Sequence, residues 1–197
     1  MRAGAVKTAI ILASASPRRL DLLRQIGLVP AAVDPAHIDE RERPHELPAE
    51  YAKRIALAKL QEVARRHGGC KFILAADTVV ACGRRILPKT EDAAAAETCL
   101  KLLSGRRHRV LGGIALRAPD GKTLTRLVTT TVAFKRLSAA EIERYLASGE
   151  WHGKAGGYAV QGKAAAFVSF ISGSYSNVVG LSLYDVAAML GGFGIEI

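Results

Sequence analysis

Cysteine is scarce in this sequence, and the few cysteines follow no pattern. The chain of 197 residues has three of them, Cys70, Cys82 and Cys99. An odd number without a CxxC pair argues against a disulfide framework and against a structural zinc site. Free thiols in a reducing compartment are the simplest interpretation, and we therefore expect a cytoplasmic protein.

Long hydrophobic runs are also missing. No stretch approaches the roughly 18 consecutive apolar residues of a membrane-spanning helix, so we expect no membrane partner. Residues 1–14 begin with basic residues and continue into a short apolar run, which resembles a weak signal peptide. That run has only about six residues, fewer than the roughly 7–15 of a signal-peptide core. We interpret it as a first buried strand.

Several common catalytic motifs are absent. The sequence has no glycine-rich loop ending in Gly-Lys-Ser/Thr and no GxSxG elbow, and its five histidines lack the HExxH spacing. A Ser/His/Asp triad assembled from distant positions is not excluded. Aromatic residues make up only 6% of the chain, which leaves few side chains for stacking nucleic-acid bases.

Acidic residues are outnumbered by basic ones. The chain has 28 Lys and Arg against 18 Asp and Glu, a formal net charge of +10. Such a field favours anionic partners such as nucleotides or nucleic acids. The basic residues are spread along the chain in pairs, and no nucleic-acid-binding motif is present. We therefore do not expect a nucleic acid partner, although a basic regulatory module that binds nucleic acid stays an alternative.

The sequence does contain an alternation of strand and helix patterns. Apolar runs predict strands at 8–14, 28–33, 72–76, 79–82, 85–87, 107–117, 123–135 and 164–171. Helical spacing and capping residues predict helices at 17–26, 48–68, 90–103, 138–148 and 182–190. This order predicts an α/β fold, a single domain over 1–197 with a mixed, twisted sheet and flanking helices.

The first candidate site follows the strand at 8–14. The segment Ser14-Ala15-Ser16-Pro17-Arg18-Arg19 leads into a helix, with Ser16 at the N-cap and Pro17 at the first helical position. A helix N-terminus presents free backbone N–H groups, and the serines and arginines add further donors for phosphate. A plain capped helix with two surface arginines would have the same sequence.

A second candidate site follows the apolar run at 72–76. Asp77 and Thr78 come directly after it, and an acid at the carboxyl end of a buried strand suits metal binding or general-base catalysis. Lys59 lies within the apolar face of the helix at 48–68, so it either reaches to the surface or points into a cleft. Alternatively, Asp77 is an ordinary acidic residue in a turn and Lys59 is a surface lysine.

Three further residues could contribute to a site. Glu40 and Lys89 are isolated charges, and Lys89 precedes a predicted helix start, where an anion can bind. Gln161 lies in the glycine-rich segment 153–162, and its amide offers both the donor and the acceptor that reading a base edge requires. A glycine-rich turn into the next strand is the alternative interpretation.

Taken together and in order, these segments resemble the Maf family of nucleoside triphosphate pyrophosphatases. The matching stretches are 12–19, 22–23, 38–40, 58–59, 76–80, 89, 103–105, 148–150, 154–162, 173–175 and 178–181. They follow the family order over nearly the whole chain. The resemblance implies an α/β fold of the Maf and inosine triphosphatase type, with two lobes and a nucleotide cleft between them.

The resemblance also implies a reaction and a set of residues for it. The reaction is hydrolysis between the α- and β-phosphates of a nucleoside triphosphate, with a divalent metal cation, Mg²⁺ or Mn²⁺. By motif, the triphosphate would be bound by Ser14, Arg18, Arg19, Lys59 and Lys89. Glu40 and Asp77 would hold the metal, and Asp77 would accept the proton of the attacking water. Arg18, Thr78 and Gln161 fall at the specificity positions of the family.

The segment Lys154–Gly162 is similar to the family branch that hydrolyses dTTP and UTP. A modified purine triphosphate such as 7-methyl-GTP stays an alternative substrate, and the family likeness implies a homodimer. Two positions depart from the family pattern. Lys89 is followed by Thr90 where the family has proline, so we expect a different loop path there, and Gly180-Leu181 is followed by Ser182 instead of proline.

Overall fold

The computed structural model describes residues 9–67, 69 and 71–197 of the chain. Its strands are β1 (Ile10–Ala13), β2 (Ala32–Val33), β3 (Phe72–Cys82), β4 (Arg85–Leu87), β5 (Lys89–Thr90), β6 (Arg107–Arg117), β7 (Thr123–Phe134), β8 (Lys154–Ala155) and β9 (Val168–Ser172). Its helices are α1 (Pro17–Gln25), α2 (Pro48–His67), α3 (Ala93–Leu103), α4 (Ala139–Ala147), the 3₁₀-helix η2 (Lys163–Phe167), α5 (Tyr175–Val179) and α6 (Leu183–Gly191). The mixed α/β class is therefore confirmed.

The main sheet has the strand order β2-β1-β3-β6-β7-β9, with β4 paired to β3. β1 is parallel to both β2 and β3, whereas the remaining pairs are antiparallel. A separate two-stranded sheet joins β5 to β8. The sheet is thus parallel at one side and antiparallel at the other.

β3 shares one of its edges between two partners. β1 pairs with residues 72–75 of β3, and β4 pairs with residues 80–82 on the same side. Along the opposite edge β6 pairs with β3 continuously, from Ile73 to Ala81. In the described chain, residues 76–79 therefore have a strand neighbour on one edge only. The resulting gap lies where β1 ends and where Asp77 and Thr78 are found.

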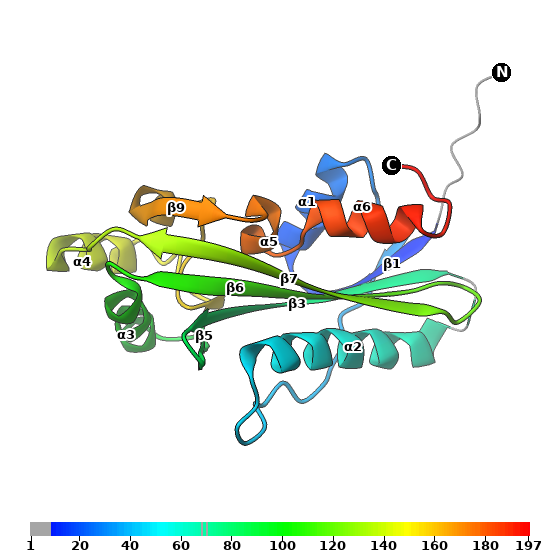
Figure 1. Cartoon of the computed structure of the whole chain (residues 1–197), viewed down its shortest axis with the longest axis horizontal. Coiled ribbons are helices and arrows are strands. Elements are labelled where there is room, and N and C mark those ends of the chain that lie inside the picture. Colours follow the sequence, from blue (N-terminus) through cyan, green and yellow to red (C-terminus); the bar gives the residue numbers. More distant parts are fainter. Residues whose placement is uncertain (1–8, 68, 70) are drawn as a thin grey trace.

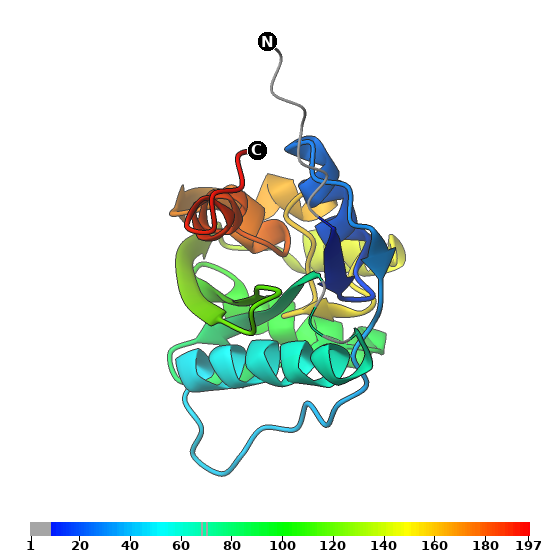
Figure 2. The ribbon, with the colours of Figure 1, turned by 90° about the vertical axis from the view of Figure 1, so that its right-hand side faces the viewer.

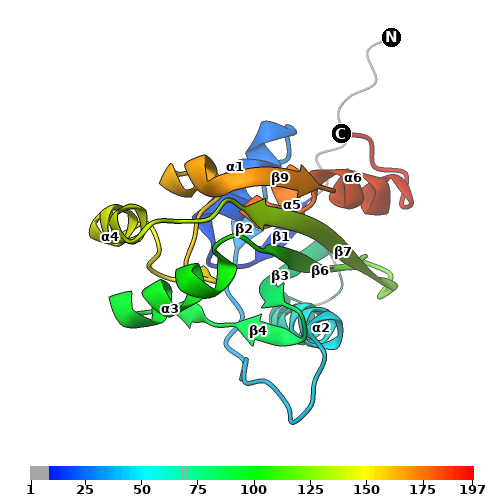
Figure 3. The same cartoon turned by 60° about the vertical axis from the view of Figure 1, so that its left-hand side comes forward.

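Helices cover both faces of the sheet (Figure 1). α2 lies along one face, against β3 and β6, and α1, α5 and α6 lie on the other face. The view along the long axis shows the sheet between α2 and α6 (Figure 2). α3 and α4 pack together near one end of the sheet (Figure 3). Because both faces are covered, β1 and residues 110–116 of β6 are buried throughout, which explains their uninterrupted apolar runs.

Most predicted elements are confirmed within a few residues, but three strand predictions were wrong. Only residues 32–33 of the predicted strand 28–33 form β2, since Pro30 has no N–H to donate to a ladder. The predicted strands 72–76 and 79–82 are one strand, because β6 pairs along both. The predicted strand 164–171 begins as the 3₁₀-helix η2, whose run of alanines favours a helical conformation, and only then becomes β9.

Two further differences concern helices. α3 begins at Ala93 instead of residue 90, because Lys89 and Thr90 pair with β8 and Asp92 caps the helix by accepting from Ala95 N. The short helix α5 was missed, since five residues cannot show a helical period. None of the helices in the described ranges is long and apolar enough to cross a membrane.

Two adjacent glycines at the centre of β6 let helices approach both faces of the sheet. A Cβ at Gly113 would overlap the carbonyl oxygen of Ala52 in α2, and a Cβ at Gly112 would overlap the Oδ1 atom of Asn177 in α5. Asn177 is fully buried, and its Nδ2 donates to Val110 O and Thr130 Oγ1, both at 3.1 Å. The glycine pair therefore fixes the distances of α2 and α5 from the sheet.

We expect Gly113→Ala to lower the free energy of unfolding by about 3 kcal/mol or more, because the new methyl group meets backbone that cannot move without shifting α2. Gly191→Ala is the matched control, since a Cβ there meets nothing within 4 Å. That variant should differ from the wild type by about 1 kcal/mol at most. Chemical denaturation of the three proteins measures both effects, and equal midpoints would contradict the packing argument.

Candidate active site

A cavity of about 390 Å³ opens at the gap beside β3. Its walls come from the β1–α1 segment, β3, the loop before α2, β8 with the segment after it, and the end of α5. All of the site residues predicted from the sequence line this one cavity: Ser14, Arg18, Arg19, Glu40, Lys59, Asp77, Thr78, Lys89 and Gln161. The structure thus brings together residues from distant parts of the chain, while their individual roles stay predictions.

The N-terminus of α1 faces this cavity. Pro17 is the first helical residue and Ser16 occupies the N-cap, as predicted, but the Ser16 side chain makes no capping hydrogen bond. The Ser16 N–H instead donates to the Oγ of Ser14 at 3.2 Å. Since no side chain at the N-cap satisfies the first N–H groups of the helix, they are suited to an anion in the cavity.

Arg19 is buried and donates to three protein oxygens. Its Nε donates to Gly180 O at 2.9 Å, its Nη1 to Ser14 Oγ at 2.9 Å, and its Nη2 to Thr78 Oγ1 at 3.0 Å. The Thr78 hydroxyl in turn donates to Gly180 O at 3.2 Å. The sequence suggested that Arg19 binds phosphate, and the geometry adds a positioning function, because this guanidinium joins β1, β3 and the end of α5.

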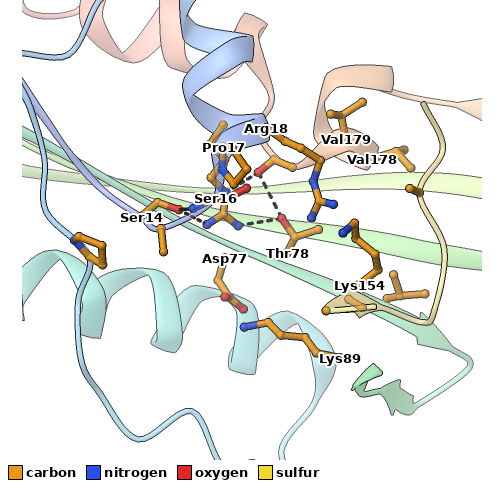
Figure 4. Close-up of a pocket in the computed structure, with 18 of the residues that line it drawn as sticks. Ser14, Ser16, Pro17, Arg18, Asp77, Thr78, Lys89, Lys154, Val178 and Val179 are labelled. Atoms are coloured by element: carbon orange, nitrogen blue, oxygen red, sulfur yellow. Dashed lines mark hydrogen bonds between the residues drawn. The ribbon is translucent and has the colours of Figure 1, made fainter. Parts of the chain in front are cut away.

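Two carboxylates and two lysines form a chain of ion pairs on the other side of the cavity. Lys59 Nζ lies 2.7 Å from Asp77 Oδ1 and 3.0 Å from Glu40 Oε1. Lys89 Nζ lies 2.8 Å from Glu40 Oε2. Lys59 is only 7% exposed and Asp77 only 3% exposed, so Lys59 does point into a cleft and not to the surface. Figure 4 shows Asp77, Thr78 and Lys89 at the cavity.

The charges of the lysines act on Glu40. Partial burial of Glu40 raises the pKa of its carboxyl, but the nearby ammonium groups of Lys59 and Lys89 outweigh burial and bring the pKa below its usual value. The Tyr51 hydroxyl of α2 donates to the carbonyl oxygen of Glu40 at 2.7 Å and so anchors the loop that carries it. Glu40 is therefore an ionised, positioned carboxylate.

The pair formed by Glu40 and Asp77 fits a divalent cation that is shared with a substrate. The described residues contain no group of three or more His, Cys, Asp or Glu side chains that could hold a metal ion. Mg²⁺ and Mn²⁺ bind in such cases through one or two carboxylates together with phosphate oxygens and water. The donor set present here matches that arrangement.

The glycine-rich segment forms a wall of the cavity next to β3. Gly156 and Gly157 have φ angles of 67° and 70°, and a Cβ on Gly156 would lie 2.9 Å from Val80. The segment therefore needs glycine both for its backbone angles and for its close approach to β3. Gln161 follows and lines the cavity with an exposed side chain. Sequence reasoning assigned no role to Lys154, Tyr158 or His152, which also line the cavity, although the family-like segment contains Lys154 and Tyr158.

Tyr158 is held from behind by a buried histidine. His108 is 2% exposed, and its Nε2 lies 2.8 Å from the Tyr158 hydroxyl. Its Nδ1 is buried without a partner among the described residues. Burial lowers the pKa of His108 from 6.5 to about 4. The histidine is therefore neutral in the folded protein at neutral pH.

This buried histidine predicts an acid sensitivity of the fold. In the unfolded chain His108 takes up a proton below its ordinary pKa of 6.5, whereas the folded protein resists protonation until about pH 4. Stability should therefore fall as the pH drops through this window, by about 3 kcal/mol in total. The measurement is the free energy of unfolding between pH 7 and 4 in the wild type and in His108→Gln, whose amide can still bond to Tyr158. Equal pH slopes in the two proteins would contradict the assignment.

Comparisons with known proteins place relatives beside this chain. The family of Maf-like proteins matches residues 9–193. A protein of Paramagnetospirillum magneticum named dTTP/UTP pyrophosphatase is 66% identical over 185 residues, covering 94% of this chain and 97% of its own. A protein of the same name from Rhodospirillum rubrum is 63% identical, covering 94% and 88%.

Solved structures resemble this one at the level of the fold. The structure of a HAM1 protein from Coxiella burnetii aligns with a TM-score of 0.51 at 16% identity, covering 94% of this chain and 99% of that one. At this identity the likeness concerns the arrangement of helices and strands alone. It confirms the predicted fold type, a mixed sheet flanked by helices.

Proposed function

The chain belongs to the Maf family, and from this premise we propose that it hydrolyses dTTP and UTP to the monophosphate and pyrophosphate. The observation that carries the proposal is the placement of Asp77 and Glu40 around Lys59, in a cavity whose lining also includes further cationic side chains and a helix N-terminus. Such a cavity suits a polyanion and offers a carboxylate to an attacking water. The names of the relatives at 66% and 63% identity support the choice of substrate.

In the proposed mechanism Asp77 is the proton acceptor. Lys59 donates to its Oδ1, which fixes the carboxylate, and Oδ2 has no hydrogen-bond donor among the described residues. A water oxygen forms a bond to the α-phosphorus, its proton passes to Asp77 Oδ2, and the bond to the α,β-bridging oxygen breaks. The electron pair of that bond leaves with pyrophosphate. The site contributes mainly by positioning the water and the substrate and by stabilising the charge of the transition state.

We also propose that Glu40 and Asp77 hold Mg²⁺ or Mn²⁺ when a nucleotide is present. When bound, such an ion would neutralise phosphate charge and polarise the phosphoryl group. Lys59 lies between the two carboxylates and offsets part of their negative charge. Ser14, Arg18, Arg19 and Lys89 would contact the triphosphate, and Thr78 and Gln161 would act in base recognition together with Arg18.

We also propose a cytoplasmic location and a homodimeric assembly. Cys82 and Cys99 are free thiols, which fits the reducing cytoplasm. Family likeness suggests a homodimer.

A panel of triphosphates tests the function. With Mg²⁺ or Mn²⁺, kcat/KM for UTP and dTTP should exceed that for CTP, ATP, GTP and 7-methyl-GTP by about tenfold or more, because a site that pairs a base edge rejects mismatched bases. The products should be the monophosphate and pyrophosphate, and a chelator should stop turnover until metal is restored. Release of orthophosphate, or fastest turnover of 7-methyl-GTP, would refute the proposal.

Replacement of the proposed proton acceptor tests the mechanism. Asp77→Asn keeps the size of the side chain but removes its basicity, so kcat/KM for UTP should fall by about 10²–10⁴. Asp21→Asn is the matched control, because Asp21 is exposed on α1 and does not line the cavity. Circular dichroism checks that both variants are folded. A folded Asp77→Asn protein with nearly wild-type kcat would show that another group accepts the proton.

A further inference from the structure

The cations of the cavity differ in what they bind. Five lysine and arginine side chains line it: Arg18, Arg19, Lys59, Lys89 and Lys154. Lys59 and Lys89 are paired with carboxylates, and Arg19 donates to three neutral oxygens. Arg18 and Lys154 form no salt bridge with any residue that the structure describes. Arg19 has no carboxylate partner either, but its donors are used within the protein. Arg18 and Lys154 are thus the two cations of the cavity that have no carboxylate partner and keep donors for a ligand.

Arg18 is the more constrained of the two. Its Nε is buried and has no hydrogen-bond partner within the described part of the chain. Burial also lowers the pKa of its guanidinium. A buried donor without an acceptor costs about 1–3 kcal/mol, more when it is charged, unless a ligand satisfies it. The position of Arg18 in the wall of the cavity allows a bound molecule to do so.

Lys154 extends from β8 toward the same place. Figure 4 shows its ammonium group pointing toward the guanidinium of Arg18. The ammonium group forms one hydrogen bond to a described residue, donating to the carbonyl oxygen of His152 at 3.0 Å. Burial and then the positive charge of Arg18 lower the pKa of Lys154, while the negative charge of Glu150 has a smaller effect in the opposite direction. Two like charges face each other here, which is unfavourable until an anion lies between them.

We propose that Lys154 and Arg18 form the subsite for the β- and γ-phosphates, the part of the substrate that leaves as pyrophosphate. The assignment rests on the proposed function, which puts the α-phosphorus next to Asp77. The β- and γ-phosphates hold most of the negative charge of the substrate. They would then lie beside Arg18 and Lys154. When the bond to the α,β-bridging oxygen breaks, the electron pair stays on pyrophosphate, and two fixed cations stabilise that charge.

A base could occupy the same space instead, because Arg18 also falls at a specificity position of the family. Val178 and Val179 offer an apolar wall beside Arg18 and Lys154 (Figure 4). Pyrophosphate and a base predict different effects of removing the Lys154 side chain. If Lys154 binds pyrophosphate, its removal weakens the binding of all triphosphates and of free pyrophosphate. If it contacts the base, its removal changes the ratio of UTP to CTP turnover and leaves pyrophosphate binding intact.

The experiment is calorimetric titration of the whole protein with inorganic pyrophosphate, without nucleotide, in the wild type and three variants. Lys154→Met removes the charge at similar length and should raise the dissociation constant about tenfold or more. Lys154→Arg keeps the charge and should stay within about threefold of the wild type. Lys163→Met is the matched control, since Lys163 is exposed in the following segment and does not line the cavity.

Each outcome decides the proposal. A loss of pyrophosphate affinity in Lys154→Met alone supports the proposal, provided that circular dichroism shows a folded protein. This result does not depend on hydrolysis of any triphosphate, so a failure of the proposed function would be recognised separately. Unchanged pyrophosphate affinity in Lys154→Met overturns it, as does a wild type that binds no pyrophosphate. A changed UTP to CTP ratio with intact pyrophosphate binding also overturns it and assigns Lys154 to the base.

Discussion

The buried guanidinium of Arg19 is the interaction on which the site depends. It donates to Ser14 after β1, to Thr78 in β3 and to Gly180 after α5, three points that are far apart in the sequence. An arginine keeps its charge and presents its donors in a rigid fork, so it fixes the angles between its partners as well as the distances. Gly180 accepts from both Arg19 and Thr78 and has a φ angle of 152°. One side chain therefore holds three walls of the cavity together.

Around this centre the charges are divided by function. Both carboxylates of the cavity form ion pairs with Lys59 or Lys89, whereas Arg18 and Lys154 form no ion pair with a described carboxylate. Paired charges hold the acids in place and limit their repulsion, and unpaired cations attract the substrate. The overall charge of +10 does not reveal this division, because most basic residues are elsewhere on the chain. Only the contacts distinguish a positioning cation from a binding cation.

Local signals in the sequence predicted much of this arrangement. Pro17 after Ser16 marked the start of α1, Lys59 stood out on an apolar helix face, and the capping box at Ser138 is present as predicted. The sequence could not show that β3 continues through Asp77, because that depends on pairing with β6 far along the chain. It also could not separate Arg19 from Arg18. The two are adjacent and chemically identical, and only tertiary contacts make one a structural hub.

The interrupted edge of β3 explains why Asp77 and Thr78 can both serve one cavity. Successive residues of a strand point to opposite faces of a sheet. Asp77 accordingly meets Lys59 of α2 on one face, and Thr78 meets Arg19 of α1 on the other. In a fully paired interior strand these two layers would be separated by the neighbouring strand. Because β1 ends at Ala13 and β4 begins to pair only at Val80, the layers meet across the gap, and a ligand there can contact both. The position of the site thus follows from strand length and register before any catalytic residue is considered.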